Sequence, residues 1–460
     1  MEKTGICRLA GLLTALRRRG LDPADEEAAR LCLLDGLGCM IYGAAMEEAP
    51  RFAAAVRAMS GEGNIAVPGA SGRFSAENAA LLGGTYAHLR ELDDVHYAIV
   101  HSGSVCVPVV VSLAQKFSSS LREVLAALVV GVEAMVRVSR ATDFLDHRQR
   151  GWHGTATCGA FGAAAAAAAL MDLDAEGCAN AMGIAGSRTG GSWAFAADGA
   201  LTKRLHPGLA ARDGIVSAFF AASGIRGPHY VLEADDGGFL TMMSRSSDLS
   251  QLDAPMPEPA IREVEYKWFA SCKSVHSPVT AATEIFRRHP VCDPDGIADI
   301  AVEVNQSALS MAGRNYDSCS VVSAQLSIPY GVALGLAGRS GRAADYMPDV
   351  LKRPELRALA DKTRVYRTDE FDEIRMKEHK SACRVTVTWK DGEKRSCKVT
   401  EPKGSFANPL SKDDILFKAA ELLDFALGAG RSGPVIDAFT NSPADVPFRE
   451  LMPLLLPKEE

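Results

Sequence analysis

The chain has 460 residues, of which 47% are hydrophobic, 23% charged and 7% aromatic. This composition is typical of a globular protein with a large core, and it excludes a disordered chain, a collagen-like fibre and a small disulfide-stapled domain. The formal net charge of −7 excludes a global basic field for nucleic acid or an anionic membrane. At about 150 residues per domain, the length predicts two or three domains.

Targeting signals and cysteine spacing give further expectations. The N-terminal stretch up to Gly20 has no long apolar run and no small-residue cleavage site, so we predict no signal peptide. No segment reaches about 18 apolar residues without a charge, so we predict no transmembrane helix. The eleven cysteines form no CxxC pair and no cluster with histidine at zinc-binding spacing. We therefore expect reduced thiols in a cytoplasmic protein.

The first part of the chain, up to about residue 265, is predicted to be helical. Residues 24–46 begin with acids and carry a broad apolar face, and residues 121–141 are apolar on most sides, as in a buried helix. The seven alanines from Ala163 to Ala169 predict a central helix, because alanine favours helices and lets neighbouring helices approach closely. Further helices are predicted at 104–118, 159–171, 208–223 and 278–288.

The pattern changes after about residue 295. Residues 298–306 and 382–400 alternate apolar and polar positions and are rich in β-branched residues, which predicts strands. Asp391-Gly392 predicts a hairpin turn within the second segment. Residues 412–428 are predicted to be a helix that packs back on the first domain. We therefore expect a mostly α fold, with a helical domain over 1–265 completed by 401–460 and an α+β domain over 266–400.

Four histidines share a local pattern. Each precedes a short break and then an apolar helix: His101 before Ser-Gly, His153 before Gly-Thr, His206 before Pro-Gly and His276 before Ser-Pro. A helix start offers unpaired N–H groups and about half a positive charge, which attract carboxylates and lower a neighbouring histidine pKa. One such histidine can equally be a cap or loop residue, but four together predict that at least two share a pocket.

Lysines lie near two of these histidines. Lys203 precedes His206 by three residues, and Lys267 and Lys273 lead to His276. A lysine beside a histidine at a helix start can bind a carboxylate, and the alternative is an ordinary surface charge.

Acidic residues precede His101. Glu91, Asp93 and Asp94 could orient a histidine, act as acid or base, or bind a metal, although their spacing matches no specific metal motif; the alternative is an exposed acidic turn. Tyr330, in an apolar run, is a candidate acid or hydrogen-bond donor, or else a packed core residue. No nucleotide-binding glycine loop, GxSxG elbow or CxxC redox pair is present.

Seven stretches, in order along almost the whole chain, resemble the MmgE/PrpD family, which includes 2-methylcitrate dehydratase, cis-aconitate decarboxylase and iminodisuccinate epimerase. They are RLCLLDGLGCMIYGAA, SAENAALLGGTYAHLRELDD, HSGSVCVPVVVSLAQ, GWHGTATCGAFGAAAAAAALMDLDAEGCANAMGIAGS, LTKRLHPGLAARDGIVSAFFAASGIRGP, YKWFASCKSVHSPVTAA and GSFANPLSKDDI. The resemblance implies a large all-helical domain with an inserted α+β domain, a homodimer without cofactor or metal, and a pocket between the domains.

The resemblance implies most residues of that pocket, and the local pattern of histidines and lysines adds His206 and Lys273. The predicted catalytic residues are Glu91, Asp93, His101, His153, Lys203, His276 and Tyr330. The predicted substrate-binding residues are Asp94, His206, Lys267, Cys272 and Lys273. The expected partner is a small anionic carboxylate, with no nucleic acid and no membrane.

Several positions depart from the family pattern. Glu91 stands where Asp is usual, Val95 where Thr is common, Leu209 where Arg is common, and Cys272 where the decarboxylase branch has a histidine; Ser102 replaces the proline of His-Pro-Gly. The longer Glu91 is expected to narrow the substrate space or re-aim a histidine, and Val95 lacks a hydroxyl that could bind a carboxylate. These departures favour a substrate other than 2-methylcitrate or cis-aconitate.

The family reactions break a bond α or β to a carboxylate and transfer a proton at carbon. Such a step needs cations for the carboxylates and a histidine base or acid over the carbon. We expect a metal-independent lyase, like 2-methylcitrate dehydratase, that dehydrates a hydroxylated di- or tricarboxylic acid. His101 or His153 would move protons, Lys203 and Lys267 would hold carboxylates, and Glu91 or Asp93 would orient a histidine. The alternatives are a decarboxylase, an epimerase, and a non-catalytic carboxylate-binding protein.

Overall fold

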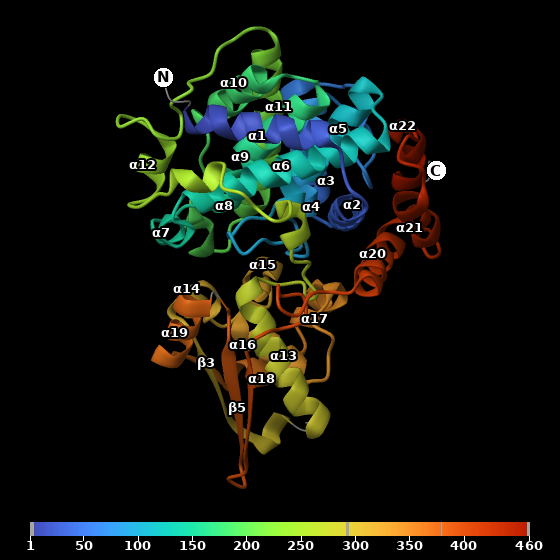
Figure 1. The fold of residues 1–460 in the computed structure, drawn as a ribbon. Coiled ribbons are helices and arrows are strands. Elements are labelled where there is room, and N and C mark those ends of the chain that lie inside the picture. Colours follow the sequence, from blue (N-terminus) through green and yellow to red (C-terminus); the bar gives the residue numbers. More distant parts are fainter. Residues whose placement is uncertain (1–3, 291–293, 379, 458–460) are drawn as a thin grey trace.

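The computed structural model describes residues 4–290, 294–378 and 380–457. Figure 1 shows a larger helical domain, a smaller domain that contains a sheet, and the C-terminal helices beside the helical domain. The predicted fold class, mostly α with a smaller α+β domain, is confirmed.

The core of the helical domain is built around α9 (Gly159–Leu170). Its alanines from Ala163 to Ala169 are buried, and α9 packs against α6 (Leu121–Ala141) and α11 (Thr202–Ala222). A Cβ at Gly131 of α6 would lie 2.8 Å from the Ala166 Cβ, so small residues on both helices permit the close approach. The alanine run is therefore a central helix, as predicted from its sequence.

Other helices surround this centre. They are α1 (Gly5–Arg19), α2 (Pro23–Ala44), α3 (Ala49–Ser60), α4 (Ala76–Ala87), α5 (Gly103–Phe117), α7 (Phe144–Gln149), α8 (Gly154–Thr157), α10 (Ala175–Gly186) and α12 (Phe239–Met243), with a small hairpin of β1 (Ile65–Ala66) and β2 (Arg73–Phe74). Short 3₁₀ helices are η1 (Trp193–Ala196), η2 (Leu249–Leu252), η3 (Ala260–Glu263), η4 (Pro294–Gly296), η5 (Ala343–Tyr346) and η6 (Met452–Leu455).

The smaller domain holds a four-stranded sheet in the order β4-β3-β5-β6. Its strands are β3 (Ile297–Val304), β4 (Thr363–Arg367), β5 (Cys383–Trp389) and β6 (Lys394–Val399). β4 runs parallel to β3, β5 is antiparallel to it, and the register places Val302 between Val365 and Val385. The predicted hairpin joins β5 and β6, and Gly392 adopts the φ of 91° that the turn requires.

Helices complete the smaller domain. α13 (Lys273–Arg288) packs on β5 and β6 and also against α16 (Ile328–Leu336). The remaining helices are α14 (Gln306–Ala312), α15 (Val321–Gln325), α17 (Pro348–Leu351), α18 (Pro354–Asp361) and α19 (Asp369–Glu378).

The chain then returns to the helical domain through α20 (Lys412–Leu427), α21 (Ser432–Asn441) and α22 (Phe448–Leu451). α20 packs on α2, where the buried Lys418 pairs with Asp35 at 2.7 Å. Lys418 Nζ also donates to the carbonyl of Leu92 at 2.6 Å. The returning helix therefore fixes the loop that carries the acidic motif.

Two helices begin earlier than the sequence predicted. α11 begins at Thr202 and α13 at Lys273, so Pro207 and Pro278 lie inside these helices. A proline near a helix start removes few hydrogen bonds, and the helix continues through it. Consequently Lys203, His206 and His276 lie within helices and not before them, which corrects the predicted pattern.

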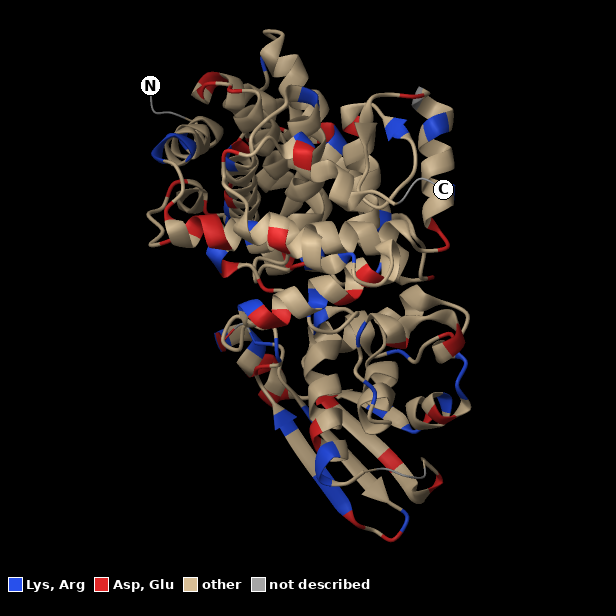
Figure 2. Ribbon diagram, turned by 90° about the vertical axis from the view of Figure 1, so that its right-hand side faces the viewer, with Lys and Arg blue, Asp and Glu red and all other residues tan. Residues whose placement is uncertain are grey.

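Acidic and basic residues are interspersed over both domains (Figure 2). The ten cysteines within the described residues are all free thiols. Among the described helices, none is both long and apolar enough to cross a membrane alone. Together α2 and α3 have the required length and composition, but they are bent by 91° relative to each other.

Candidate active site

The loop between α4 and α5 carries the central residues of the site. It carries His88 and the acidic motif, and it is buried at His88, Glu91, Asp93 and Asp94. The Val95 backbone exchanges two hydrogen bonds of 2.8 Å with Glu265, in the segment that leads to α13. The loop therefore lies where the two domains meet.

Asp93 orients two histidines. Its Oδ2 lies 2.7 Å from His88 Nδ1 and 3.3 Å from His101 Nδ1. Burial would raise the pKa of Asp93, but the neighbouring His88 and His101 outweigh it and hold the pKa well below its usual range. Asp93 is thus an ionised carboxylate that favours a proton on each Nδ1.

The contacts of these histidines fix their tautomers. His101 Nδ1 also lies 2.7 Å from the carbonyl oxygen of Asp94, which can only accept, so Nδ1 carries the proton. The Nε2 of His101 is then the basic nitrogen. His88 is held in the same way by Asp93, and its buried Nε2 has no hydrogen-bond partner within the described residues. Burial lowers the pKa of His88 to about 3, so its ring is neutral at pH 7.

A third histidine completes the cluster. His153 is the residue before α8, and its Nδ1 lies 2.9 Å from Nδ1 of His206 on α11. Burial and then Lys203 lower the pKa of His153 well below its usual value, and burial lowers that of His206 to about 4. The ring centroids of His88 and His101 are 4.8 Å apart, and that of His153 is 5.9 and 6.5 Å from them.

Three imidazoles so close together could hold a metal. One nitrogen of each of His88, His101 and His153 lies within 4.8 Å of the others. Zinc–nitrogen bonds of about 2.0–2.1 Å in a tetrahedral site need ligand atoms about 3.4 Å apart, so the rings would have to move together to bind it. As placed, the three imidazoles present nitrogens that can exchange protons with a molecule beside them.

Glu91 lies in a cage of cations. Its carboxylate accepts hydrogen bonds from Lys203 and Arg204 on one oxygen and from Lys267, at 3.1 Å, on the other. Burial would raise the pKa of Glu91, but Lys203, Lys267 and Arg204 outweigh it and hold the pKa well below the usual range. Glu91 also has a left-handed φ of 55°, which is uncommon for a residue with a side chain.

This placement corrects the prediction for Glu91. Its longer side chain does not re-aim a histidine, because its carboxylate is held by the three cations; Asp93 does the orienting. Three cations against one carboxylate leave the cage with a net charge of +2. Burial lowers the pKa of Lys203, whereas Glu91 and Asp93 raise that of Lys267 against the effect of burial. The cage therefore keeps a positive field next to the histidines.

Asp94 has a positioning role. It accepts hydrogen bonds from Ser102 Oγ at 2.7 Å and from the Gly103 amide at 2.8 Å, which caps α5. Burial and the neighbouring Asp93 raise the pKa of Asp94 to about 6. A Cβ at Gly103 would lie 2.6 Å from the Asp94 carboxylate, so glycine is needed there.

The second domain brings its own predicted residues to different places. His276 is buried, with Nε2 at 3.2 Å from the Ser271 carbonyl and Nδ1 unpartnered among the described residues. Cys272 precedes α13, and its thiol is an electrostatic neighbour of Lys203 and Lys267. Lys273 turns away to Glu265, at 2.7 Å, and to the Gly404 carbonyl.

Tyr330 is not brought to the cluster. It is fully buried in the smaller domain, where its hydroxyl donates to the Asp345 carbonyl at 2.6 Å. Its ring packs against Tyr316 and Tyr346. This is the packed core role that was the alternative to a catalytic one.

Three residues of the site were not predicted from the sequence. His88 is the central ring, and Arg204 joins the cage while donating to Gln325 Oε1 at 3.1 Å. Gln325 also donates to the carbonyls of Arg90 and Ala270, at 2.6 and 3.1 Å, and so ties the domains together. His88 stands three residues before Glu91, and its closeness to the acidic motif could have marked it as a site residue. No local feature of the sequence marked Gln325.

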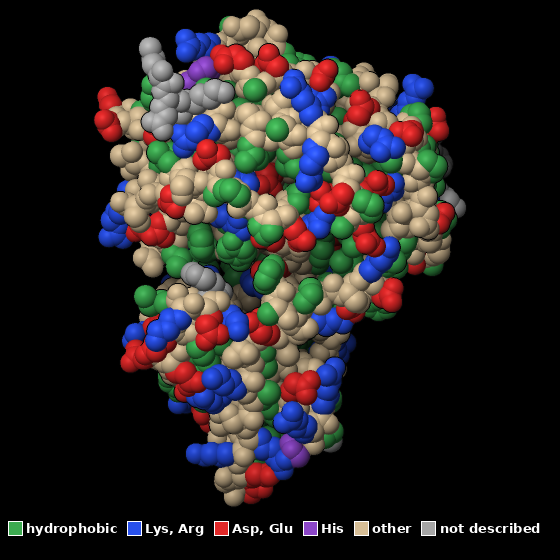
Figure 3. All heavy atoms as spheres, viewed as in Figure 1, with side chains coloured by type: hydrophobic (Ala, Val, Ile, Leu, Met, Phe, Trp, Pro, Cys, Tyr) green, Lys and Arg blue, Asp and Glu red, His purple; other side chains and the backbone are tan. Residues whose placement is uncertain are grey.

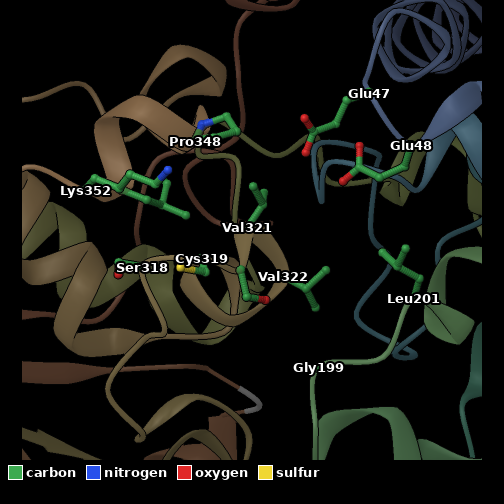
Figure 4. Close-up of a pocket in the computed structure, with 12 residues that line it drawn as sticks. Glu47, Glu48, Gly199, Leu201, Ser318, Cys319, Val321, Val322, Pro348 and Lys352 are labelled. Atoms are coloured by element: carbon green, nitrogen blue, oxygen red, sulfur yellow. The ribbon is translucent and has the colours of Figure 1, made fainter.

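A separate cleft of about 420 Å³ lies between the domains. Glu47, Glu48 and Leu201 line it from the helical domain, opposite Val321 and Lys352 (Figure 4). Its lining contains no histidine, so it is not the proton-transfer site. On the face seen in Figure 3, the junction of the domains is hollowed and rimmed mainly by hydrophobic side chains.

Comparisons with known proteins agree with this architecture. The MmgE/PrpD N-terminal domain model matches residues 7–252, and the C-terminal domain model matches residues 269–438. A cis-aconitate decarboxylase-like protein, oryM, of Aspergillus oryzae is 28% identical over 455 residues, covering 94% of this chain and 93% of that protein. The cis-aconitate decarboxylase of Aspergillus terreus is 28% identical over 86% of this chain and 84% of its own. The cis-aconitate decarboxylase of Mus musculus is 25% identical over 88% of this chain and 84% of its own. The chain belongs to the MmgE/PrpD family.

Proposed function

We propose that the chain is a lyase that acts on a small polycarboxylic acid. One observation carries the proposal: buried neutral histidines, oriented through their Nδ1 atoms, lie beside a cage of lysines and arginine with a net positive charge. Such a site can attract carboxylates and move a proton at a neighbouring carbon.

The leading reaction is decarboxylation of an unsaturated tricarboxylate such as cis-aconitate. One carboxylate leaves as CO₂, and the electron pair of the broken C–C bond passes into an enediolate stabilised by Lys203 and Lys267. His101 Nε2 takes a proton from solvent and passes it to the carbon, while its Nδ1 proton stays hydrogen-bonded to Asp93 and the Asp94 carbonyl. The names of the relatives support this choice.

Dehydration, the reaction expected from the sequence, is the second candidate. Cys272 favours it, because it stands where the decarboxylase branch has a histidine. A neutral histidine would take a proton from carbon, and a second would protonate the leaving hydroxyl, which departs as water. Neither reaction needs a metal, since the charge is borne by lysines and arginine; activity should survive dialysis against a chelator.

A substrate panel tests the proposal. The purified protein is incubated with cis-aconitate, 2-methylcitrate and simpler hydroxylated dicarboxylates, and the products are followed by mass spectrometry together with CO₂ release. Loss of 44 mass units with CO₂ supports decarboxylation, and loss of 18 supports dehydration. Binding of these acids without any product would contradict a lyase and favour a non-catalytic binding protein.

A further inference from the structure

Arg148 is a cation whose charge no carboxylate of the described residues neutralises. It lies on α7, half-buried, and its guanidinium stacks on the ring of Trp193 with Cζ 3.6 Å from the ring centroid. Within the described residues its side chain forms neither an ion pair nor a hydrogen bond, and its Nε is buried without a partner. A partly buried guanidinium without a counter-charge gains stability when an anion joins it.

The other cations of the site are already occupied. Lys203, Arg204 and Lys267 all contact Glu91. Arg148 is therefore the cation of the site whose hydrogen-bond donors are not engaged by the described part of the chain. Burial lowers the pKa of its guanidinium to about 10, which still leaves it charged at pH 7.

Trp193 places Arg148 at the histidine cluster. The Trp193 ring meets the His153 ring edge to face, with centroids 5.3 Å apart, and Lys203 Nζ is 6.0 Å from its centre. The thiol of Cys272 is an electrostatic neighbour of Arg148, as it is of Lys203. Arg148 and the cage thus lie around a common space.

The Trp193 platform is fixed by backbone hydrogen bonds. Its amide donates to the Gly151 carbonyl at 2.7 Å, and the His153 amide donates to the Gly191 carbonyl at 3.0 Å. Stacking holds the guanidinium in one plane and leaves its edge free, which is the geometry for bidentate binding of a carboxylate.

We propose that Arg148, held on Trp193, binds one carboxylate of the substrate and sets the preference for tricarboxylates over dicarboxylates. This inference rests on the proposed function for the class of ligand. In this proposal Arg148 binds the substrate carboxylate that lies farthest from the Glu91 cage.

Binding of unreactive acids tests it. Propane-1,2,3-tricarboxylate and glutarate lack a hydroxyl and a double bond, and their affinities are measured by calorimetry for the wild type, Arg148→Gln and Arg148→Lys. The Gln variant should bind the triacid about 10- to 100-fold more weakly and glutarate at most about threefold more weakly. The Lys variant, which keeps charge but not the stacked plane, should fall between. Arg150→Gln, which removes an exposed charge two residues away, is the matched control.

The outcomes separate this inference from the proposed function. If Arg148→Gln binds the triacid as tightly as the wild type, the inference is wrong even if turnover persists. If the Gln variant does not fold, Arg148→Lys is judged by the same result. If triacid binding depends on Arg148 but no acid is converted, the lyase assignment fails and the inference stands. If Arg150→Gln weakens triacid binding as much as Arg148→Gln does, the effect comes from the overall positive charge and not from Arg148, and the inference is overturned.

Discussion

Glu91 holds three buried cations at the centre of the site. Lys203 and Arg204 come from α11, and Lys267 comes from the segment before α13, so one carboxylate joins both domains. Because all four groups are buried, their mutual attraction is only weakly screened by water. The cage therefore serves both stability and substrate attraction.

Glu91→Gln tests this double role. Removing the carboxylate leaves like charges buried together, and we expect a loss of about 3–5 kcal/mol in the free energy of unfolding. Denaturant unfolding measures it, with the exposed Glu62→Gln as the control. A change within about 0.5 kcal/mol, as is usual for surface substitutions, would show that Glu91 does not hold the cage together.

At this scale the sequence identified most chemical groups but not their pairing. His101, His153, His206, Lys203 and Lys267 were all predicted, and the structure brings them together. What could not be predicted is that Glu91 neutralises the lysines, because the pairing joins segments 112 and 176 residues apart. For the same reason Gln325, 121 residues from Arg204, gave no local signal.

At the scale of elements, α11 carries Lys203 and His206 and must lie close to α4. Gly208 permits this contact, because a Cβ there would meet the Leu81 carbonyl directly and lie 2.6 Å from Thr85 Oγ1. In turn, a Cβ added at Gly84 of α4 would lie 2.8 Å from the Gly208 backbone. The small residues thus set how deeply α11 inserts its cations.

Gly208→Ala should therefore push α11 away from α4. We expect a destabilisation of about 1–3 kcal/mol from overpacking, together with a fall in activity as Lys203 and His206 shift. Gly11→Ala is the control: nothing lies within 4 Å of its added Cβ, and alanine there should stabilise helix α1 by about 0.5–1 kcal/mol. Equal stability changes in the two variants, measured by denaturant unfolding, would contradict close packing at Gly208.

Element boundaries were predictable where periodicity was strong. α6 spans Leu121–Ala141 as predicted, and α20 and β3 differ from prediction by at most two residues at either end. β4 was not predicted, because its five residues are mostly exposed and its identity as a strand depends on parallel pairing with β3, whose partner residues lie 63 positions earlier. Proline misled the prediction at α11 and α13, since a proline in the second turn does not end a helix.

At the scale of the whole molecule, buried histidines couple stability to pH. Burial lowers the pKa of His88 to about 3 and that of His206 to about 4, whereas an unfolded histidine has a pKa near 6.5. Between these values these histidines bind more protons in the unfolded chain than in the folded one, so each lowers the free energy of unfolding as the pH falls. Asp94, whose pKa is raised to about 6, acts in the opposite direction and offsets part of this effect. Each such histidine contributes at most about 1.4 kcal/mol per pH unit in that window.

Urea unfolding between pH 7 and pH 4.5 measures this coupling. We expect stability to fall steadily below about pH 6.5, and His88→Gln to reduce the slope. His229→Gln, whose ring lies against Asn180 and Glu176 of α10, is the matched histidine control. Stability that is flat or rises as the pH falls would contradict neutral buried imidazoles.

The resemblance to the family also predicts a homodimer. α11 exposes Leu209 and Phe220, which are 41% and 50% accessible and lie eleven residues apart on one helix face. An obligate interface would bury more than about 2,000 Å². Light scattering should give twice the monomer mass, and Phe220→Glu should shift it toward monomer, whereas Met376→Glu, on the exposed α19, should not. A monomeric wild type at working concentration would contradict the prediction.

In the proposed reaction the histidine cluster moves a proton at a carbon of a polycarboxylate. The most direct measurement is the deuterium content of the product, or of recovered substrate, after incubation with cis-aconitate and the hydroxylated acids in D₂O. We expect deuterium at the enediolate carbon that is protonated after CO₂ loss, or at the carbon that is deprotonated in dehydration, and a rate about 10²- to 10⁴-fold lower in His101→Gln. A wild type that binds these acids without any exchange or product, or a His101→Gln variant as active as the wild type, would contradict it.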